Sequence, residues 1–176
     1  MMTKSNLQNG LFFCDVYNTY FCNGENHIEE LKKFVNNLKE LKNIYNINVL
    51  YFSFITNDTA DYIREAIDDI KYHLPEDIIL SKQYFINGYI ENDMEYSFNY
   101  NSKASVIIDV LRQYKNIICF YVDDYIGNHY GLGEYENVIS MILSNDEKDS
   151  ERIYYSKNKG LTGVNDCLVK IKNQQR

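Results

Sequence analysis

The stretch LFFCDVYNT, residues 11–19, decides the fold because it joins an apolar strand to a polar loop at an acidic residue. Four apolar residues lead directly to Asp15. A short unbroken apolar run is typical of a strand that is buried on both faces. A carboxylate at the end of such a strand loses contact with water and needs compensation. Asp15 is therefore the first candidate for chemistry in this chain.

Apolar runs and amphipathic segments alternate along the rest of the sequence. We predict strands at 49–55, 78–80, 117–122 and 153–155, and helices at 28–45, 59–70, 102–111, 135–143 and 164–171. This alternation indicates βαβ units with helices on both faces of a mainly parallel sheet. We expect one α/β domain over residues 1–176, with a Rossmann-like three-layer α/β/α architecture.

Residues 82–101 interrupt this rhythm. Asn87-Gly88, between two short apolar pairs, predicts a small β-hairpin arm. The aromatic residues of the arm either line the site, where they could stack on a ring, or pack on one another as a hairpin face; they are Tyr84, Phe85, Tyr89, Tyr96, Phe98 and Tyr100. We favour packing, and the acidic residues on the same arm disfavour nucleic acid as a ligand.

Composition excludes several classes of protein. The net charge of −7 argues against nonspecific nucleic-acid binding, which needs an excess of Lys and Arg. No apolar run approaches the roughly 18 residues of a membrane span. The N-terminal residues lack the apolar stretch of a signal peptide, and the four cysteines lack metal-binding spacing. We expect a reduced, cytoplasmic protein without a membrane partner.

Polar residues follow the predicted strands in a set order. Asp15 ends the first strand, Thr56-Asn57 follow the second, and Asp123-Asp124 follow the strand at 117–122. Lys103 stands at the start of the helix before that last strand. In parallel α/β sheets, ligands bind at the carboxyl ends of the strands, where the strand order reverses. Each of these residues alone also fits an ordinary turn, cap or surface position, but together they predict a site.

This order resembles the four motifs of the haloacid dehalogenase superfamily, and the resemblance covers residues 11 to 171. The family's first motif, Asp-x-Asp-x-Thr after an apolar strand, is matched by residues 15–19 except at Tyr17. Thr56-Asn57, Lys103 and the acidic pair match the other three motifs. A response-regulator receiver combines similar residues, but its paired acids close the first strand, so we discount it.

The resemblance implies a Mg²⁺-dependent phosphatase and a role for each matched residue. Asp15 would be the nucleophile that forms an aspartyl-phosphate. Mg²⁺ would be held by Asp15, the Tyr17 carbonyl, and Asp123 or Asp124, since this ion prefers oxygen ligands. The transferring phosphoryl oxygens would be bound by residues of the second and third motifs, namely Thr56, Asn57 and Lys103.

Tyr17 departs from the phosphatase pattern. Family phosphatases have a second Asp there, which protonates the leaving oxygen and later activates water, and a tyrosine with an ordinary pKa near 10 cannot serve as that base. The loss of a general acid typically costs on the order of 10² to 10⁴ in rate, so we expect weak activity. His129, near the acidic pair in sequence, is one candidate to replace the base.

Two alternatives stay open beside the phosphatase. A catalytically impaired relative would keep the fold and the metal for binding or regulation. Haloacid dehalogenases themselves carry Asp-x-Tyr in the first motif, because a halide leaves without a proton. Those enzymes insert a helical cap before the second motif, however, and residues 19–49 hold only one helix and a short loop. A nearly capless site favours a phosphorylated substrate that can be macromolecular.

Overall fold

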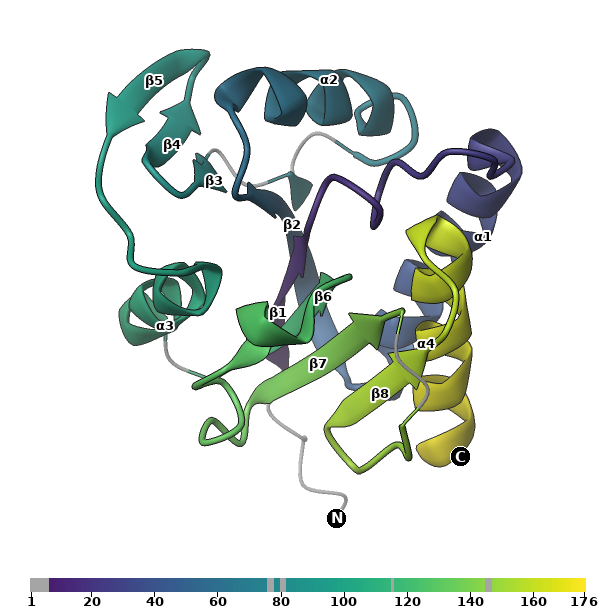
Figure 1. Ribbon diagram of the computed structural model, residues 1–176. Coiled ribbons are helices and arrows are strands. Elements are labelled where there is room, and N and C mark those ends of the chain that lie inside the picture. The colour runs from purple at the N-terminus through teal and green to yellow at the C-terminus, as the bar shows by residue number, and fades with distance from the viewer. Residues whose placement is uncertain (1–6, 76–77, 80–81, 115, 145–146) are drawn as a thin grey trace.

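In the computed structural model of the protein, the described residues (7–75, 78–79, 82–114, 116–144 and 147–176) form a sheet enclosed by helices (Figure 1). The elements are β1 Gln8–Cys14, α1 His27–Ile44, β2 Ile47–Thr56, α2 Ala60–Ile70, β3 Lys82–Phe85, β4 Gly88–Glu91, β5 Met94–Ser97, α3 Lys103–Gln113, β6 Ile117–Asp123, the short 3-10 helix η2 Ile126–His129, β7 Val138–Leu143, β8 Ile153–Ser156 and α4 Gly160–Gln174.

The sheet has eight strands among these residues, in the order β5-β4-β3-β2-β1-β6-β7-β8. The strands β3, β2, β1, β6, β7 and β8 follow one another in space, and each pairs in parallel with the next. β4 and β5 extend the β3 edge of the sheet by antiparallel pairing. The chain lays β2 and β3 on one side of β1 and then places β6 on the other side. The strand order therefore reverses at β1 and β6, and the expected α/β architecture with a mainly parallel sheet is confirmed.

Alternation along β1 divides the core between the two faces of the sheet. Phe12 and Cys14 face α1, α2 and α4, whereas Leu11 and Phe13 face α3. All four side chains are fully buried, which explains why this stretch reads as an unbroken apolar run. Figure 1 shows α1 and α4 together on one face of the sheet and α3 on the other.

The arm at 82–101 is a three-stranded extension of the main sheet. β3 pairs in parallel with β2, and a second tight turn at Asn92-Asp93 joins β4 to β5. Both turn residues have positive φ, as a two-residue hairpin turn of this kind requires. The rings pack on one another: Tyr89 stacks on Tyr96 with centroids 5.0 Å apart, and Phe98 lies 4.6 Å from Tyr100. The contacts support the packing interpretation of the arm.

Two predicted elements, at 135–143 and 78–80, differ from the structure or are only partly described in it. The prediction of a helix at 135–143 is wrong, since residues 138–143 form β7. Every residue of β7 is buried, and periodicity cannot separate a short apolar run in a strand from one in a helix. In the predicted strand 78–80, Ile79 makes an isolated parallel bridge to Phe52, and Leu80 lies outside the described residues. Among the helices described, none is long and apolar enough to cross a membrane.

Candidate functional site

Strand register brings the two principal carboxylates together. β1 and β6 are parallel neighbours in which Cys14 pairs with Val122, so the next residues, Asp15 and Asp123, lie side by side. The backbone N–H of Asp15 donates to the Val122 carbonyl at 3.1 Å, which extends the pairing to the end of the strand. Both carboxylates are buried, with 4% of Asp15 and none of Asp123 exposed.

Lys103 occupies the space between these two carboxylates. Its Nζ donates to Asp15 Oδ1 at 2.5 Å and to Asp123 Oδ2 at 2.7 Å, and the side chain is buried. Lys103 is the first residue of α3, whose N-cap Ser102 forms a capping box with Ser105. A cation is unfavourable at a helix N-terminus, so the two carboxylates offset an otherwise poor position. This placement indicates a lysine that serves the site rather than the helix.

Asp123 accepts hydrogen bonds from four donors. Oδ2 accepts from Lys103 and from the Tyr121 hydroxyl at 2.6 Å, while Oδ1 accepts from Tyr125 N and from Asn128 Nδ2, both at 3.0 Å. A carboxylate offers about four acceptor positions, so this set fills the group. Asp123 is therefore fixed as the partner of Lys103.

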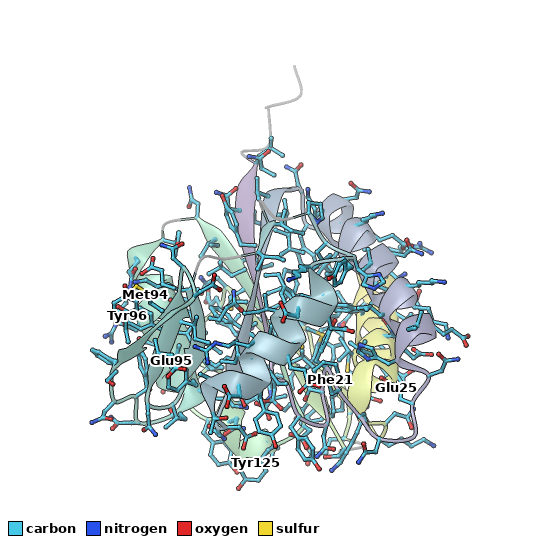
Figure 2. All side chains as sticks on the ribbon, turned by 90° about the horizontal axis from the view of Figure 1, so that it is seen from above. Phe21, Glu25, Met94, Glu95, Tyr96 and Tyr125 are labelled. Atoms are coloured by element: carbon cyan, nitrogen blue, oxygen red, sulfur yellow. The ribbon has the colours of Figure 1, made fainter. Side chains whose placement is uncertain are left out.

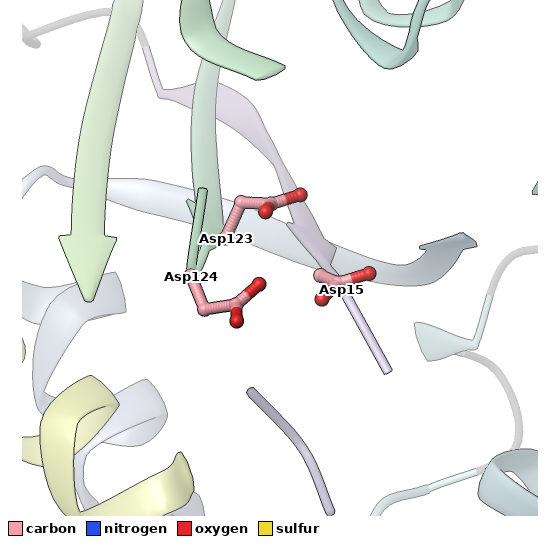
Figure 3. A group of neighbouring side chains, drawn as sticks. All are labelled: Asp15, Asp123 and Asp124. Atoms are coloured by element: carbon pink, nitrogen blue, oxygen red, sulfur yellow. The ribbon is translucent and has the colours of Figure 1, made fainter. Parts of the chain in front are cut away.

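Asp124 directly follows β6 and completes an acidic cluster. One oxygen each of Asp15, Asp123 and Asp124 lie within 4.8 Å of one another. Figure 3 shows the three carboxylates turned toward a common space at the ends of β1 and β6. Asp124 is only partly buried and has a loose ion pair with Lys159 at 3.7 Å. Its oxygens are thus less occupied than those of Asp123.

The buried charges shift the pKa of each group in the cluster. Burial, followed by the charge of Asp123, raises the pKa of Asp15 to about 7. Burial would also raise the pKa of Asp123, but Lys103 and the hydroxyl and amide donors outweigh it and lower that pKa. Burial and the charge of Asp123 raise the pKa of Asp124. For Lys103, the two carboxylates outweigh burial and raise its pKa. Lys103 therefore stays protonated between the two carboxylates, while the pKa of Asp15 lies near neutrality.

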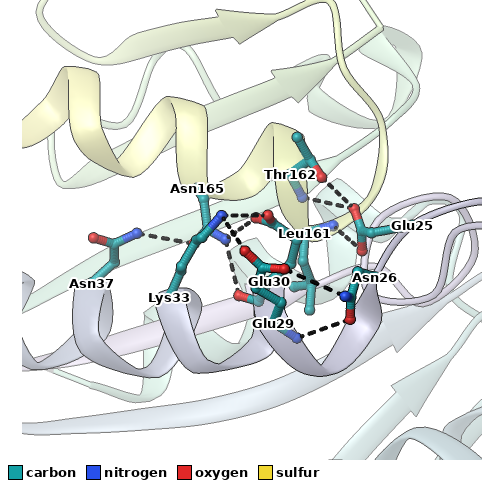
Figure 4. A network of polar contacts seen from close by, with 9 residues as sticks. All are labelled: Glu25, Asn26, Glu29, Glu30, Lys33, Asn37, Leu161, Thr162 and Asn165. Atoms are coloured by element: carbon teal, nitrogen blue, oxygen red, sulfur yellow. Dashed lines mark hydrogen bonds and ion pairs between the residues drawn. The ribbon is translucent and has the colours of Figure 1, made fainter.

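The loop after β1 is tied to both the carboxylate and α4. Thr19 donates its hydroxyl to Asp15 Oδ2 at 3.2 Å, and the Asn18 carbonyl accepts from Gly160 N at 2.6 Å. Glu25 accepts from Leu161 N and Thr162 N at the start of α4, at 3.1 and 2.8 Å (Figure 4). Tyr17 precedes Asn18 in the same loop and is 53% exposed.

The second motif is adjacent to the cluster in the sheet but makes no described contact with it. Thr56 is buried at the end of β2, where its hydroxyl accepts from Asp58 N at 3.1 Å and donates to Asp58 Oδ2 at 3.5 Å. Asn57 is exposed beyond the strand. The phosphoryl-binding roles of Thr56 and Asn57 stay predictions, as does the metal-binding role of the Tyr17 carbonyl.

His129 does not suit the role of the missing base. It is buried, its ring lies 4.5 Å from the ring of Tyr121, and neither nitrogen has a well-formed hydrogen bond. Burial lowers the pKa of His129 to about 4, although the nearby Asp123 opposes the shift. The sequence interpretation missed Tyr121 and Asn128, which hold Asp123. Alternation in β6 places Tyr121 on the same face as Asp123 and could have revealed it; Asn128 carries no such signal.

These observations define the class of the protein: a parallel α/β sheet with a charged site at the point where its strand order reverses. Among solved structures, the chain is similar to a haloacid dehalogenase-like hydrolase protein, yhjK, from Bacillus subtilis, with a TM-score of 0.54 and 12% identity over 95% of this chain and 91% of that one. The chain has the haloacid dehalogenase-like fold. No model of a protein family matches the sequence, and no curated protein matches it.

Proposed function

We propose that the protein is a Mg²⁺-dependent phosphohydrolase in which Asp15 is the nucleophile. The observation that carries the proposal is the buried Asp15–Lys103–Asp123 bridge, closed by contacts of 2.5 and 2.7 Å at the carboxyl end of the central strand. Burying three charges is costly unless they are paired, and a buried pair seldom adds stability over apolar packing. Such a site is better explained by chemistry than by folding.

The donor set fits Mg²⁺. Three carboxylates converge within 4.8 Å, and this ion prefers oxygen ligands. Since the acceptor positions of Asp123 are filled, we assign the metal to Asp15, Asp124 and the Tyr17 carbonyl, with Asp123 as the anchor of Lys103. Bound there, the cation would neutralise the repulsion between the nucleophile and a phosphate.

The reaction proceeds in two displacements. A carboxylate oxygen of Asp15 attacks phosphorus and forms an O–P bond while the ester P–O bond breaks, and the leaving oxygen keeps the electron pair and takes a proton from solvent. Water then attacks phosphorus, the Asp15–phosphate bond breaks, and the proton of that water passes to solvent as phosphate departs. Lys103 compensates the charge of Asp15 and of the phosphoryl group. Thr56 reaches a phosphoryl oxygen by exchanging its long 3.5 Å contact to Asp58.

The surroundings of the site bear on the substrate and the rate. Between β1 and β2 the chain forms only α1 and a loop, which supports a nearly capless site and a phosphorylated substrate that can be macromolecular. Tyr17 supplies no carboxylic acid, and hydrolysis of esters with poor leaving groups is slow for that reason. We place the protein in the cytoplasm, in keeping with its four free cysteines.

A catalytically impaired binding or regulatory protein is the second candidate, favoured by Tyr17. Turnover separates the two. With millimolar Mg²⁺, the phosphohydrolase releases p-nitrophenolate from p-nitrophenyl phosphate, a good leaving group that needs no proton, and Asp15→Asn reduces this to background without unfolding. Absent turnover in a protein that still binds Mg²⁺ would favour the binding protein.

Thermal unfolding with and without Mg²⁺ tests the metal assignment. Mg²⁺ that binds the folded state raises the melting temperature by mass action. Asp124→Asn removes a ligand and should abolish that rise. Asp123→Asn removes the anchor of Lys103, so it should lower the melting temperature without Mg²⁺ and leave part of the rise intact. A melting curve of the wild-type protein that does not respond to Mg²⁺ would reject the metal site.

A further inference from the structure

Two exposed tyrosine rings follow the carboxylates of the site. Tyr17 comes two residues after Asp15 and is 53% exposed, and Tyr125 comes directly after Asp124 and is 62% exposed. Because the carboxylates converge, both rings start from backbone that borders the site. Figure 2 shows Tyr125 reaching outward from the body of the protein. Exposed tyrosines such as Tyr72 also occur elsewhere on this protein, so the position of these two beside the buried charged site, and not their exposure alone, points to a ligand.

The ring of Tyr125 is exposed but held in place. Its backbone N–H donates to Asp123 Oδ1 at 3.0 Å, which fixes the residue relative to the site. The ring lies against Gly127 so closely that a Cβ at that position would be 2.4 Å from Tyr125 Cε1 and 2.8 Å from Cζ. Gly127 is not among the described glycines with positive φ, so its backbone does not require glycine. Because Gly127 has no side chain, the Tyr125 ring can occupy the space beside it.

We propose that Tyr125 is a stacking platform for a planar aromatic ring in the leaving group of the substrate. The Tyr125 ring lies beside Gly127 of η2, and its 62% exposure leaves ring surface open to a ligand. The proposal rests on the phosphohydrolase function and names its substrate class: phosphate monoesters with an aromatic ring close to the ester oxygen. The carboxylate of Asp124 and the net charge of −7 disfavour longer polyanions.

Binding of two matched phosphonates tests the platform without any turnover. Benzylphosphonate and cyclohexylmethylphosphonate carry the same charge and the same number of carbon atoms, but only the first has a planar ring, and neither is cleaved at its P–C bond. Calorimetry on the full chain with Mg²⁺ should show benzylphosphonate binding about threefold to tenfold more tightly. Inorganic phosphate, measured in parallel, reports the charged part of the site alone.

Variants at Tyr125 and Gly127 test whether the Tyr125 ring causes the preference for the aromatic phosphonate. Tyr125→Leu should abolish the preference for the aromatic ligand, and Tyr125→Phe should retain it. Gly127→Ala should weaken the preference, because the new methyl group displaces the ring without removing it. Tyr72→Leu, at an exposed tyrosine after α2, is the control and should leave the preference unchanged. All variants should bind inorganic phosphate like the wild type.

The outcomes separate the platform from the proposed function. Equal affinities for the two phosphonates in a protein that binds inorganic phosphate would overturn the platform and leave the phosphohydrolase standing. A preference that survives Tyr125→Leu would also overturn it. If neither the phosphonates nor inorganic phosphate binds, the platform and the proposed function fall together.

Discussion

At the scale of the residue, opposing interactions act on the carboxylate of Asp15. Burial and the neighbouring Asp123 raise its pKa to about 7, while Lys103 and Thr19 hold the carboxylate in place. A nucleophile must be ionised to attack, so the site needs a second cation besides Lys103, or a pH above neutrality, to hold that charge. The requirement for an ionised Asp15 is therefore a physical reason to expect a metal ion beside it, in addition to the match with the first sequence motif.

The raised pKa of Asp15 has a consequence for stability. Between about pH 4, the ordinary range of the group in the unfolded chain, and pH 7, the folded protein binds more protons than the unfolded one, so the free energy of unfolding falls as pH rises. Urea unfolding between pH 4.5 and 7 in EDTA, with about half-unit steps, measures this slope. Asp15→Asn should reduce the slope, and an unchanged slope in that variant would contradict the raised pKa.

Tyr17 decides how far the site works as a phosphatase. Tyr17→Asp places a carboxylic acid two residues after the nucleophile. The rate should rise about tenfold or more, which is about 1.4 kcal/mol of transition-state stabilisation, for alkyl phosphates, whose leaving oxygen needs a proton. The rise should be small for p-nitrophenyl phosphate. No rise for either ester in a variant that still binds Mg²⁺ would favour the binding protein.

At the scale of the element, α4 and the loop after β1 are joined through Glu25. Its carboxylate accepts from Leu161 N, Thr162 N and the Thr162 hydroxyl, and it thereby satisfies N–H groups that α4 itself cannot pair. The N-cap residue, Lys159, makes no side-chain capping bond. The loop that carries Tyr17 therefore depends on the start of α4 for its position.

Glu25→Ala tests this junction. The loss of the capping carboxylate should lower the free energy of unfolding by about 1–2 kcal/mol, as urea denaturation would measure it. Glu65→Ala, at an exposed residue of α2, is the matched control and should change stability by less than about 0.5 kcal/mol. Equal effects of the two changes would show that Glu25 does not cap α4.

At the scale of the whole molecule, the sequence was sufficient for the α/β class and for the residues at the strand ends. Periodicity and the order of the strands carry that information. It could not separate Asp123 from Asp124, because alternation in β6 indicates only Tyr121, whereas no local pattern indicates the Tyr125 N–H and Asn128 amide that also bind Asp123. It also misread residues 138–143, whose full burial in β7 removes the alternation by which a strand is recognised.

Reductive trapping of the aspartyl-phosphate tests the central claim most directly. The wild-type protein is incubated with p-nitrophenyl phosphate and Mg²⁺ and then treated with borohydride, which reduces an acyl phosphate to the alcohol and so converts the aspartate to homoserine. Mass spectrometry of the peptide that contains residue 15 should find homoserine there, and Asp15→Asn should give none. Turnover without homoserine at residue 15, or homoserine at another acidic residue, would contradict the assignment of Asp15 as the nucleophile.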